Sequence, residues 1–179
     1  NKLMKKFTIK KGEHYSSPKK VKLLTSPMKK GFQWLIYFDD TCKYNLNSVD
    51  QLDWNKACGI SLFDFIPNDN NSIRLGWRYN PESDKIELTA YVHDQGPTVF
   101  LPDEPFEVDP HKGIRVTIRT YVDKWVLEVT EIEAKKTKTF SYTPKEVNTY
   151  MFAYENGFYF GGNKTAPHDM ALAKELTRC

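Results

Sequence analysis

The fold of this chain is decided by Ser72-Ile73-Arg74-Leu75-Gly76-Trp77-Arg78-Tyr79 and by the segment that follows it, Lys85-Ile86-Glu87-Leu88-Thr89-Ala90-Tyr91-Val92-His93. Apolar and polar residues alternate through both segments, which is the two-residue period of a β-strand that buries one face. The intervening Asn80-Pro81-Glu82-Ser83-Asp84 is rich in the residues that form turns. We therefore predict an antiparallel hairpin with one apolar face and one polar face.

The same alternation recurs along most of the chain, between clusters of turn-forming residues. The strongest further strand segments are Phe32–Phe38, Ile114–Tyr121 and Trp125–Ile132. About ten short strands at this spacing predict an all-β domain, which we expect to be a jelly-roll-like antiparallel β-sandwich. At most one or two short helices are expected. The segment that favours a helix is Asn47–Lys56, with Ser48 in position to cap it.

Length and composition describe a globular chain. Its 179 residues are enough for one domain with a sizeable core, and hydrophobic residues make up 40% of them. No apolar run approaches the roughly 18 residues that span a bilayer, so we expect no membrane association. The three cysteines, Cys42, Cys58 and Cys179, have neither zinc-ligand spacing nor the density of a disulfide framework. We favour free thiols, and a Cys42–Cys58 bridge stays open.

Charge divides the chain into two parts. Residues 1–30 hold ten lysines against Glu13 alone, a balance of +9, so residues 31–179 carry −6 within a formal total of +3. We expect a basic N-terminal arm or edge strands over residues 1–30 and a β-sandwich domain over residues 31–179. Such an arm could dock on another protein or on a second copy of the chain, and we disfavour nucleic acid as its partner. The alternative is a strand edge whose lysines block edge-to-edge pairing.

The first residues do not resemble a secretion signal. Met4-Lys5-Lys6 looks like a natural start, but Phe7-Thr8-Ile9 is followed at once by Lys10-Lys11, which leaves no apolar core for a signal peptide. We therefore favour the cytoplasm or a virion as the location. A signal removed before residue 1 would overturn this expectation.

The polar faces of the hairpins give the main functional clue. If both hairpins share a sheet, its outer face carries Glu87, Glu128 and seven candidate ligand-binding residues: Arg74, Arg78, Tyr91, His93, Arg115, Arg119 and Tyr121. Such a face suits sugars, because apolar ring faces stack on aromatics while hydroxyls and carboxylates meet polar groups. The alternative is a solvated face on which opposite charges pair across neighbouring strands.

A second constrained segment runs from Phe158 to Met170. We expect a strand that enters a tight structural turn formed by Gly161, Gly162, Asn163, His168 and Asp169. Adjacent residues of an extended segment point to opposite faces, so His168 and Asp169 cannot form a catalytic pair with each other. Their expected role is to satisfy backbone groups of the turn.

Other motifs of catalysis or metal binding are missing from the sequence. The four histidines, His14, His93, His111 and His168, are far apart and lack zinc-ligand spacing. No acidic stretch has the spacing of an EF-hand, and no phosphate-binding glycine loop or nucleophile elbow is present. We expect no metal and no cofactor, and we assign no catalytic residue.

Three stretches resemble a small family of Bacteroidota and their phages that has no established activity. They are Ile9-Lys10-Lys11-Gly12-Glu13-His14-Tyr15-Ser16, Ser72-Ile73-Arg74-Leu75-Gly76-Trp77-Arg78, and Tyr159-Phe160-Gly161-Gly162-Asn163 with Ala166-Pro167-His168-Asp169. The resemblance implies a bacterial or phage setting and carries over no catalytic residue. The expected sandwich also resembles concanavalin-like lectins, glucanases and polysaccharide lyases, although the paired-glutamate motif of the glucanases is missing.

These observations favour a non-enzymatic binding or assembly module, either glycan-binding or a structural component of a virion or cell surface. The alternative is a polysaccharide lyase-like enzyme that acts on an acidic glycan. Such an enzyme needs a tyrosine or histidine base and an arginine that neutralises the uronate carboxylate. Convergence of these groups in a deep cleft would favour the enzyme, and a shallow face would favour the binder.

Overall fold

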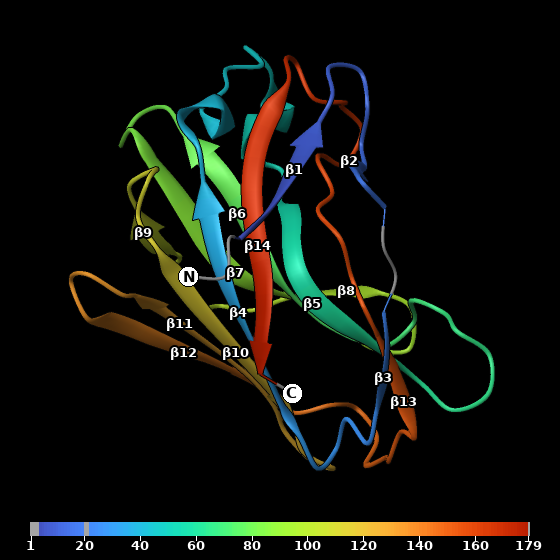
Figure 1. Cartoon of the computed structure of the whole chain (residues 1–179). Helices are drawn as coiled ribbons and strands as arrows, with labels where there is room; N and C mark the ends of the chain where they lie inside the picture. Colours follow the sequence, from blue (N-terminus) through green and yellow to red (C-terminus); the bar gives the residue numbers. More distant parts are fainter. Residues whose placement is uncertain (1–3, 20–21, 179) are drawn as a thin grey trace.

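Two antiparallel β-sheets pack face to face in the computed structural model, which describes residues 4–19 and 22–178 (Figure 1). In sheet order, the β4 sheet contains β12 (Lys136–Tyr142), β11 (Trp125–Glu131), β10 (Ile114–Thr120), β4 (Gly31–Phe38), β14 (Met170–Arg178), β1 (Lys5–Ile9) and β2 (Ser16–Ser17). The β6 sheet contains β3 (Leu23–Thr25), β13 (Phe152–Glu155), β5 (Asn55–Phe63), β6 (Ser72–Asn80), β7 (Lys85–His93) and β8 (Thr98–Phe100), and β9 (Phe106–Val108) also pairs with β7. The predicted jelly-roll-like β-sandwich is confirmed.

Helical structure in the described residues is limited to two single turns of 3₁₀ helix, η1 (Asp40–Cys42) and η2 (Val49–Leu52). Ser48 caps η2, since its side chain accepts a hydrogen bond from the backbone N–H of Asp50. The helix expected over Asn47–Lys56 is therefore shorter, because the last two residues of that segment begin β5 and pair with β6. None of the helices in the described residues is long and apolar enough to cross a membrane.

The core fills the space between the sheets with the inward side chains of the alternating strands. Phe38 of β4 meets Trp77 of β6 with their ring centroids 5.2 Å apart, so aromatic packing joins the two layers. Trp34 and Trp125 are also fully buried. Each such ring contributes on the order of 2–3 kcal/mol to folding by leaving water. The apolar residues of each alternating segment therefore form the buried face of the corresponding strand.

The first thirty residues supply strands to both sheets. Strand β1 pairs with β14 from Lys5 opposite Lys174 to Ile9 opposite Met170, and Phe7 and Ile9 are buried. Strands β2 and β3 lie at the ends of the two sheets. The sequence also predicts a short strand over residues 21–24; Leu23 and Leu24 belong to β3, and Val21 lies outside the described residues.

Two of the three cysteines are buried free thiols. Cys42 and Cys58 do not form a bridge, and burial raises the pKa of each to about 12. Both thiols therefore stay protonated and act as small apolar side chains. Cys179 lies outside the described residues.

The predicted structural turn is held by hydrogen bonds to distant parts of the chain. Gly161 has a φ of +92°, a conformation that favours glycine, and its N–H donates to Asn55 Oδ1 at 2.6 Å. His168 Nε2 donates to the Thr41 carbonyl at 2.7 Å. The carboxylate of Asp169 accepts a hydrogen bond from the backbone N–H of Lys11 at 2.8 Å. Asn163 is exposed, and within the described residues its side chain has no hydrogen-bond partner.

The two glycines of this turn should differ in their tolerance of a side chain. A Cβ at Gly161 would lie 2.0 Å from the Lys164 carbonyl oxygen, whereas one at Gly162 would meet only the movable carboxylate of Asp53, at 3.1 Å. We expect Gly161→Ala to lower the free energy of unfolding by roughly 2–5 kcal/mol, through the left-handed conformation and the clash. Gly162→Ala should cost less than about 1 kcal/mol. Urea unfolding of both variants checks this, and equal losses would show that the turn does not depend on Gly161.

Candidate functional site

The two hairpins lie in different sheets, so the seven candidate ligand-binding residues do not share a face. Strands β6 and β7 belong to the β6 sheet, whereas β10 and β11 belong to the β4 sheet. The premise of one common sheet was wrong, because alternation shows which residues face outward and not which strands pair. Arg74, Arg78, Tyr91 and His93 are grouped on the outer face of the β6 sheet. The other three, Arg115, Arg119 and Tyr121, belong to β10 and the turn after it, on the other side of the sandwich.

Some outward-pointing side chains of the β6 sheet are buried, whereas the outward-pointing arginines of β10 are exposed to solvent. Arg74 and Glu87 are only 9% and 7% exposed, although they point away from the core. Arg115 and Arg119 are exposed. The residues after β13 pair with β5 at the edge of this face, and the Gly157 carbonyl accepts a hydrogen bond from Arg74. This segment and the outer side chains of β5 and β6 border a cleft.

This cleft has a volume of about 1060 Å³ and is rich in basic and aromatic side chains. Its basic residues are Lys5, Lys19, Lys22, Lys56, Arg74 and Lys174. Its aromatic residues are Phe7, Tyr15, Tyr154, Phe158 and Tyr159. Three acidic residues also line the cleft, Asp69, Glu155 and Glu175, so its basic side chains outnumber its acidic ones. Three of these lysines come from the basic first thirty residues, and the cleft therefore attracts negatively charged ligands.

Lys56 of β5 is held between two tyrosine rings. Its Nζ lies 4.5 Å from the ring centroid of Tyr91 and 4.6 Å from that of Tyr159. We call these three residues the lysine clamp. Burial and, to a lesser extent, the neighbouring charge of Arg74 lower the pKa of Lys56 to about 8, although Asp69 opposes the shift. The ammonium is therefore protonated at neutral pH but close to its titration range.

The backbone fixes the position of Tyr159 in the clamp. Tyr159 exchanges two hydrogen bonds with Lys56, at 2.8 and 2.9 Å, and so extends the β6 sheet beyond β13. Its ring stacks on His14 at 5.2 Å and meets the edge of Tyr15 at 5.0 Å. Burial raises the pKa of Tyr159. Because Tyr15 is 57% exposed, its ring is the part of this aromatic group that a ligand reaches first.

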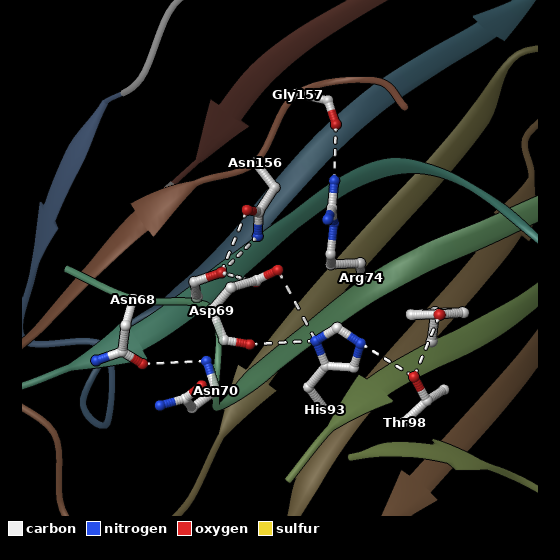
Figure 2. Close-up of polar contacts among 10 residues, drawn as sticks. Asn68, Asp69, Asn70, Arg74, His93, Thr98, Asn156 and Gly157 are labelled. Carbon is white, nitrogen blue, oxygen red and sulfur yellow. Dashed lines mark hydrogen bonds and ion pairs between the residues drawn. The ribbon is translucent and has the colours of Figure 1, made fainter. Parts of the chain in front are cut away.

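Arg74 of β6 brings a second cation to the same place. Its Nη2 donates to the Gly157 carbonyl at 3.0 Å, while its buried Nε has no hydrogen-bond partner within residues 4–19 and 22–178 (Figure 2). Burial lowers the pKa of this guanidinium, which nevertheless stays charged. An unpaired buried donor costs about 1–3 kcal/mol, and because this Nε has almost no accessible surface, a ligand would pair with it only after the guanidinium shifts.

His93 and Arg78, two other predicted residues, are engaged by protein groups. His93 lies between the Asp69 carbonyl, to which Nδ1 donates at 3.1 Å, and the Thr98 hydroxyl, 3.1 Å from Nε2 (Figure 2). Arg78 forms an ion pair with Glu87 at 2.6 Å and lies over the ring of Trp54 at 4.0 Å. Of the seven candidates, Arg74 alone is among the residues that line the cleft. Tyr91 contacts the cleft residue Lys56 as part of the lysine clamp.

A buried ion pair joins the two sheets at the cleft. Lys174 of β14 lies 3.3 Å from Glu155 of β13, with side chains only 5% and 15% exposed, and it also donates to the Asn156 carbonyl at 2.9 Å. Burial lowers the pKa of Lys174, and the charge of Glu155 acts in the opposite direction. Lys174 therefore has its charge balanced inside the protein, unlike Lys56.

Sequence reasoning missed most of the residues at the centre of the cleft. Lys56 was assigned to the end of the expected helix, and Tyr159 was read only as part of the strand before the turn. His14 and Tyr15 stand in one of the stretches that carry the family resemblance, which was the one available signal. Among the described residues, no three His, Cys, Asp or Glu side chains are grouped so as to hold a metal ion.

Comparisons with known proteins identify the fold. The chain matches no protein-family profile and no curated protein sequence. It is similar to the alginate lyase from Klebsiella pneumoniae, with a TM-score of 0.61, 12% identity and coverage of 84% of this chain but only 59% of that one. It is also similar to the alginate lyase vAL-1 from Chlorella virus, with a TM-score of 0.56, 10% identity and coverage of 97% and 82%.

A further similar structure is the xylan β-1,4-xylosidase from Bacillus halodurans, with a TM-score of 0.50, 10% identity and coverage of 82% of this chain and 27% of that one. At such low identities these likenesses show a shared sandwich architecture. They do not assign an activity to this chain, because one fold hosts many functions.

The buried ion pair offers a test of how the cleft is held together. We expect Glu155→Leu to lower the free energy of unfolding by about 3–5 kcal/mol, because it leaves the Lys174 charge buried without its partner. The double variant Glu155→Leu/Lys174→Met should recover at least half of this loss, since it removes both charges. Urea unfolding of the two single variants and the double variant measures the coupling. Strictly additive losses would contradict an energetic link between the two side chains.

Proposed function

We propose that this β-sandwich is a glycan-binding module whose cleft holds an oligosaccharide. The observation that carries the proposal is the gathering of tyrosine rings and cationic donors in one cleft of about 1060 Å³. Sugar rings stack their apolar faces on aromatic side chains, while their hydroxyl and carboxylate groups take hydrogen bonds from charged donors. The volume is at the upper end of ordinary ligand pockets and is large enough for more than one sugar unit.

The individual residues support specific roles in this binding. The exposed ring of Tyr15 offers a stacking surface at the mouth of the cleft, where Lys19 Nζ lies 4.4 Å from its centroid and the ring of Tyr159 packs against it in a T-shaped arrangement. Lys56 and Arg74 offer donors further in. The shared architecture with alginate lyases and a xylosidase is consistent with a glycan ligand, and the proposal itself rests on the side chains of this chain.

A second candidate function is a polysaccharide lyase-like enzyme, favoured by the convergence of Arg74, Lys56 and Tyr159 in a cleft. A lyase removes the proton beside the uronate carboxyl group and needs a base for this step. The pKa of Tyr159 is raised rather than lowered, and the ring nitrogens of His93 both meet protein groups. Lys56 is a further basic group at the centre of the cleft, and its ammonium lies against two rings. Binding without turnover is therefore the better-supported function.

Tyrosine variants on the two sides of the sandwich test the binding proposal. We expect Tyr15→Ala to weaken binding of the preferred oligosaccharide by about 1–3 kcal/mol, because it removes a stacking surface at the cleft. Tyr121→Ala is the matched control, since Tyr121 is also exposed but follows β10 in the other sheet. Calorimetric titration with xylose, mannuronate and galacturonate oligomers provides the measurement. Equal weakening by both variants, or the absence of any binding by the parent, would contradict the proposal.

An absorbance assay separates the two candidate functions. Elimination creates a carbon–carbon double bond next to the carboxyl group of the new sugar end, and this product absorbs ultraviolet light. With mannuronate or galacturonate polymers we expect no increase in absorbance from the parent protein, at neutral or mildly alkaline pH. A steady increase that is lost in Lys56→Met would replace the binding module with the lyase.

A further inference from the structure

We infer that Lys56 and Arg74 together form a carboxylate subsite, so that the ligand of the cleft is a glycan containing uronic acid. This inference rests on the proposed glycan-binding function and adds to it the chemical class of the ligand. It assigns to Lys56 and Arg74 the selection of acidic over neutral sugars.

The first argument is the unbalanced charge at this point of the cleft. Within residues 4–19 and 22–178, neither Lys56 nor Arg74 has a carboxylate partner in an ion pair. Glu155 pairs with Lys174, and Asp69, which accepts a hydrogen bond from Ser61 at 2.9 Å, is the acid whose charge acts on both cations, so one carboxylate faces two positive charges. Two partly or fully buried cations that repel each other are unfavourable, and a bound anion would relieve this repulsion.

The second argument is that the fold makes room for these two side chains. A Cβ at Gly59 would lie 2.5 Å from the Ile73 carbonyl oxygen and 2.6 Å from the Cα and Cγ of Arg74, its partner on the neighbouring strand, so a larger residue would push the two strands apart and move the Arg74 side chain. Gly76 is the partner of Lys56 across the same pair of strands and presents no side chain there. Glycines on both strands thus leave the cations accessible from the cleft.

The third argument concerns the kind of anion. A planar guanidinium matches a planar carboxylate, and that of Arg74 lines the cleft with, among the described residues, only Nη2 engaged, by the Gly157 carbonyl. The rings of Tyr91 and Tyr159 flank Lys56, and Tyr15 lies beyond them. An acid group next to aromatic surface fits a uronic acid, in which the carboxylate is attached directly to the sugar ring.

The decisive comparison uses one oligosaccharide with and without its charge. Mannuronate and galacturonate oligomers of fixed length are titrated into the protein beside the same oligomers with their carboxyl groups reduced to alcohols. We expect the parent to bind at least one acidic oligomer about tenfold or more tighter than its reduced form. Lys56→Met should lose most of this preference and keep the affinity for the reduced form. Lys136→Met, which removes an exposed lysine of β12, should keep the preference.

The pH dependence of binding is a second measurement, and a lysine with only a structural role would not produce it. The groups that face Lys56 are Arg74, Asp69, Tyr91 and Tyr159, and with them present the pKa of Lys56 is about 8. The uronate is ionised throughout this range, so its affinity should fall as the pH rises from about 7 to about 9 and Lys56 loses its proton. Lys56→Arg keeps its charge and should bind the acidic oligomer equally well at both pH values.

The outcomes separate failure of this inference from failure of the proposed function. Equal binding of acidic and reduced oligomers by the parent would overturn the carboxylate subsite and leave the glycan-binding module in place. The carboxylate subsite would also be overturned if Lys56→Met weakened the binding of the acidic and the reduced oligomer equally at an unchanged melting temperature. Lys56 would then affect only the shape of the cleft. Tighter binding of a sulfated oligomer than of the uronate would assign the subsite to sulfate instead. The absence of any binding would overturn both proposals.

Discussion

The arrangement of the cleft depends on the backbone pairing of the segment from Asn156 to Phe160. On one side this segment pairs with β5, where Tyr159 and Lys56 exchange two hydrogen bonds. On the other side, Phe160 donates to the His14 carbonyl at 2.7 Å and Ser16 donates to the Phe158 carbonyl at 3.3 Å. Because residues 14–16 lead into β2 of the β4 sheet, this pairing joins the two sheets at one edge. It also sets Tyr159 beside Lys56 and Gly157 beside Arg74.

The cations of the cleft fall into two groups, and the difference between them relates structure to function. Lys174 is buried with an acidic partner and a carbonyl acceptor, so its charge is balanced and it connects the sheets. Lys56 and Arg74 are held in place by rings and by one carbonyl, and Asp69 acts on both charges without forming an ion pair with either in the part of the chain that the structure describes. Folding alone would favour a partner for such groups. Charged side chains that are held in fixed positions without an ion-pair partner are expected where a bound ligand supplies that partner.

The sequence allowed much of the fold to be predicted and little of the site. Alternation in Ser72–His93 and in β4 identified the strands and their buried faces, because that pattern is local. Pairing between distant segments is not local, so the hairpins were placed in one sheet and Lys56 was assigned to a helix. The clamp forms only when the residues around Tyr159 pair with β5. Gly161 could be predicted as a turn residue, since a pair of glycines is a local signal, whereas the hydrogen bond from its N–H to Asn55 could not.

The central claim is that a carboxylated glycan occupies the cleft around Lys56 and Arg74. Its most direct test is to follow the backbone amide signals of the protein by nuclear magnetic resonance during titration with a uronic acid oligomer. We expect the changing signals to cluster at Lys56, Arg74 and residues 157–159, with those of Arg115 and Arg119 unchanged. Signals that change along β10 instead, or no change at all in the cleft, would contradict the claim.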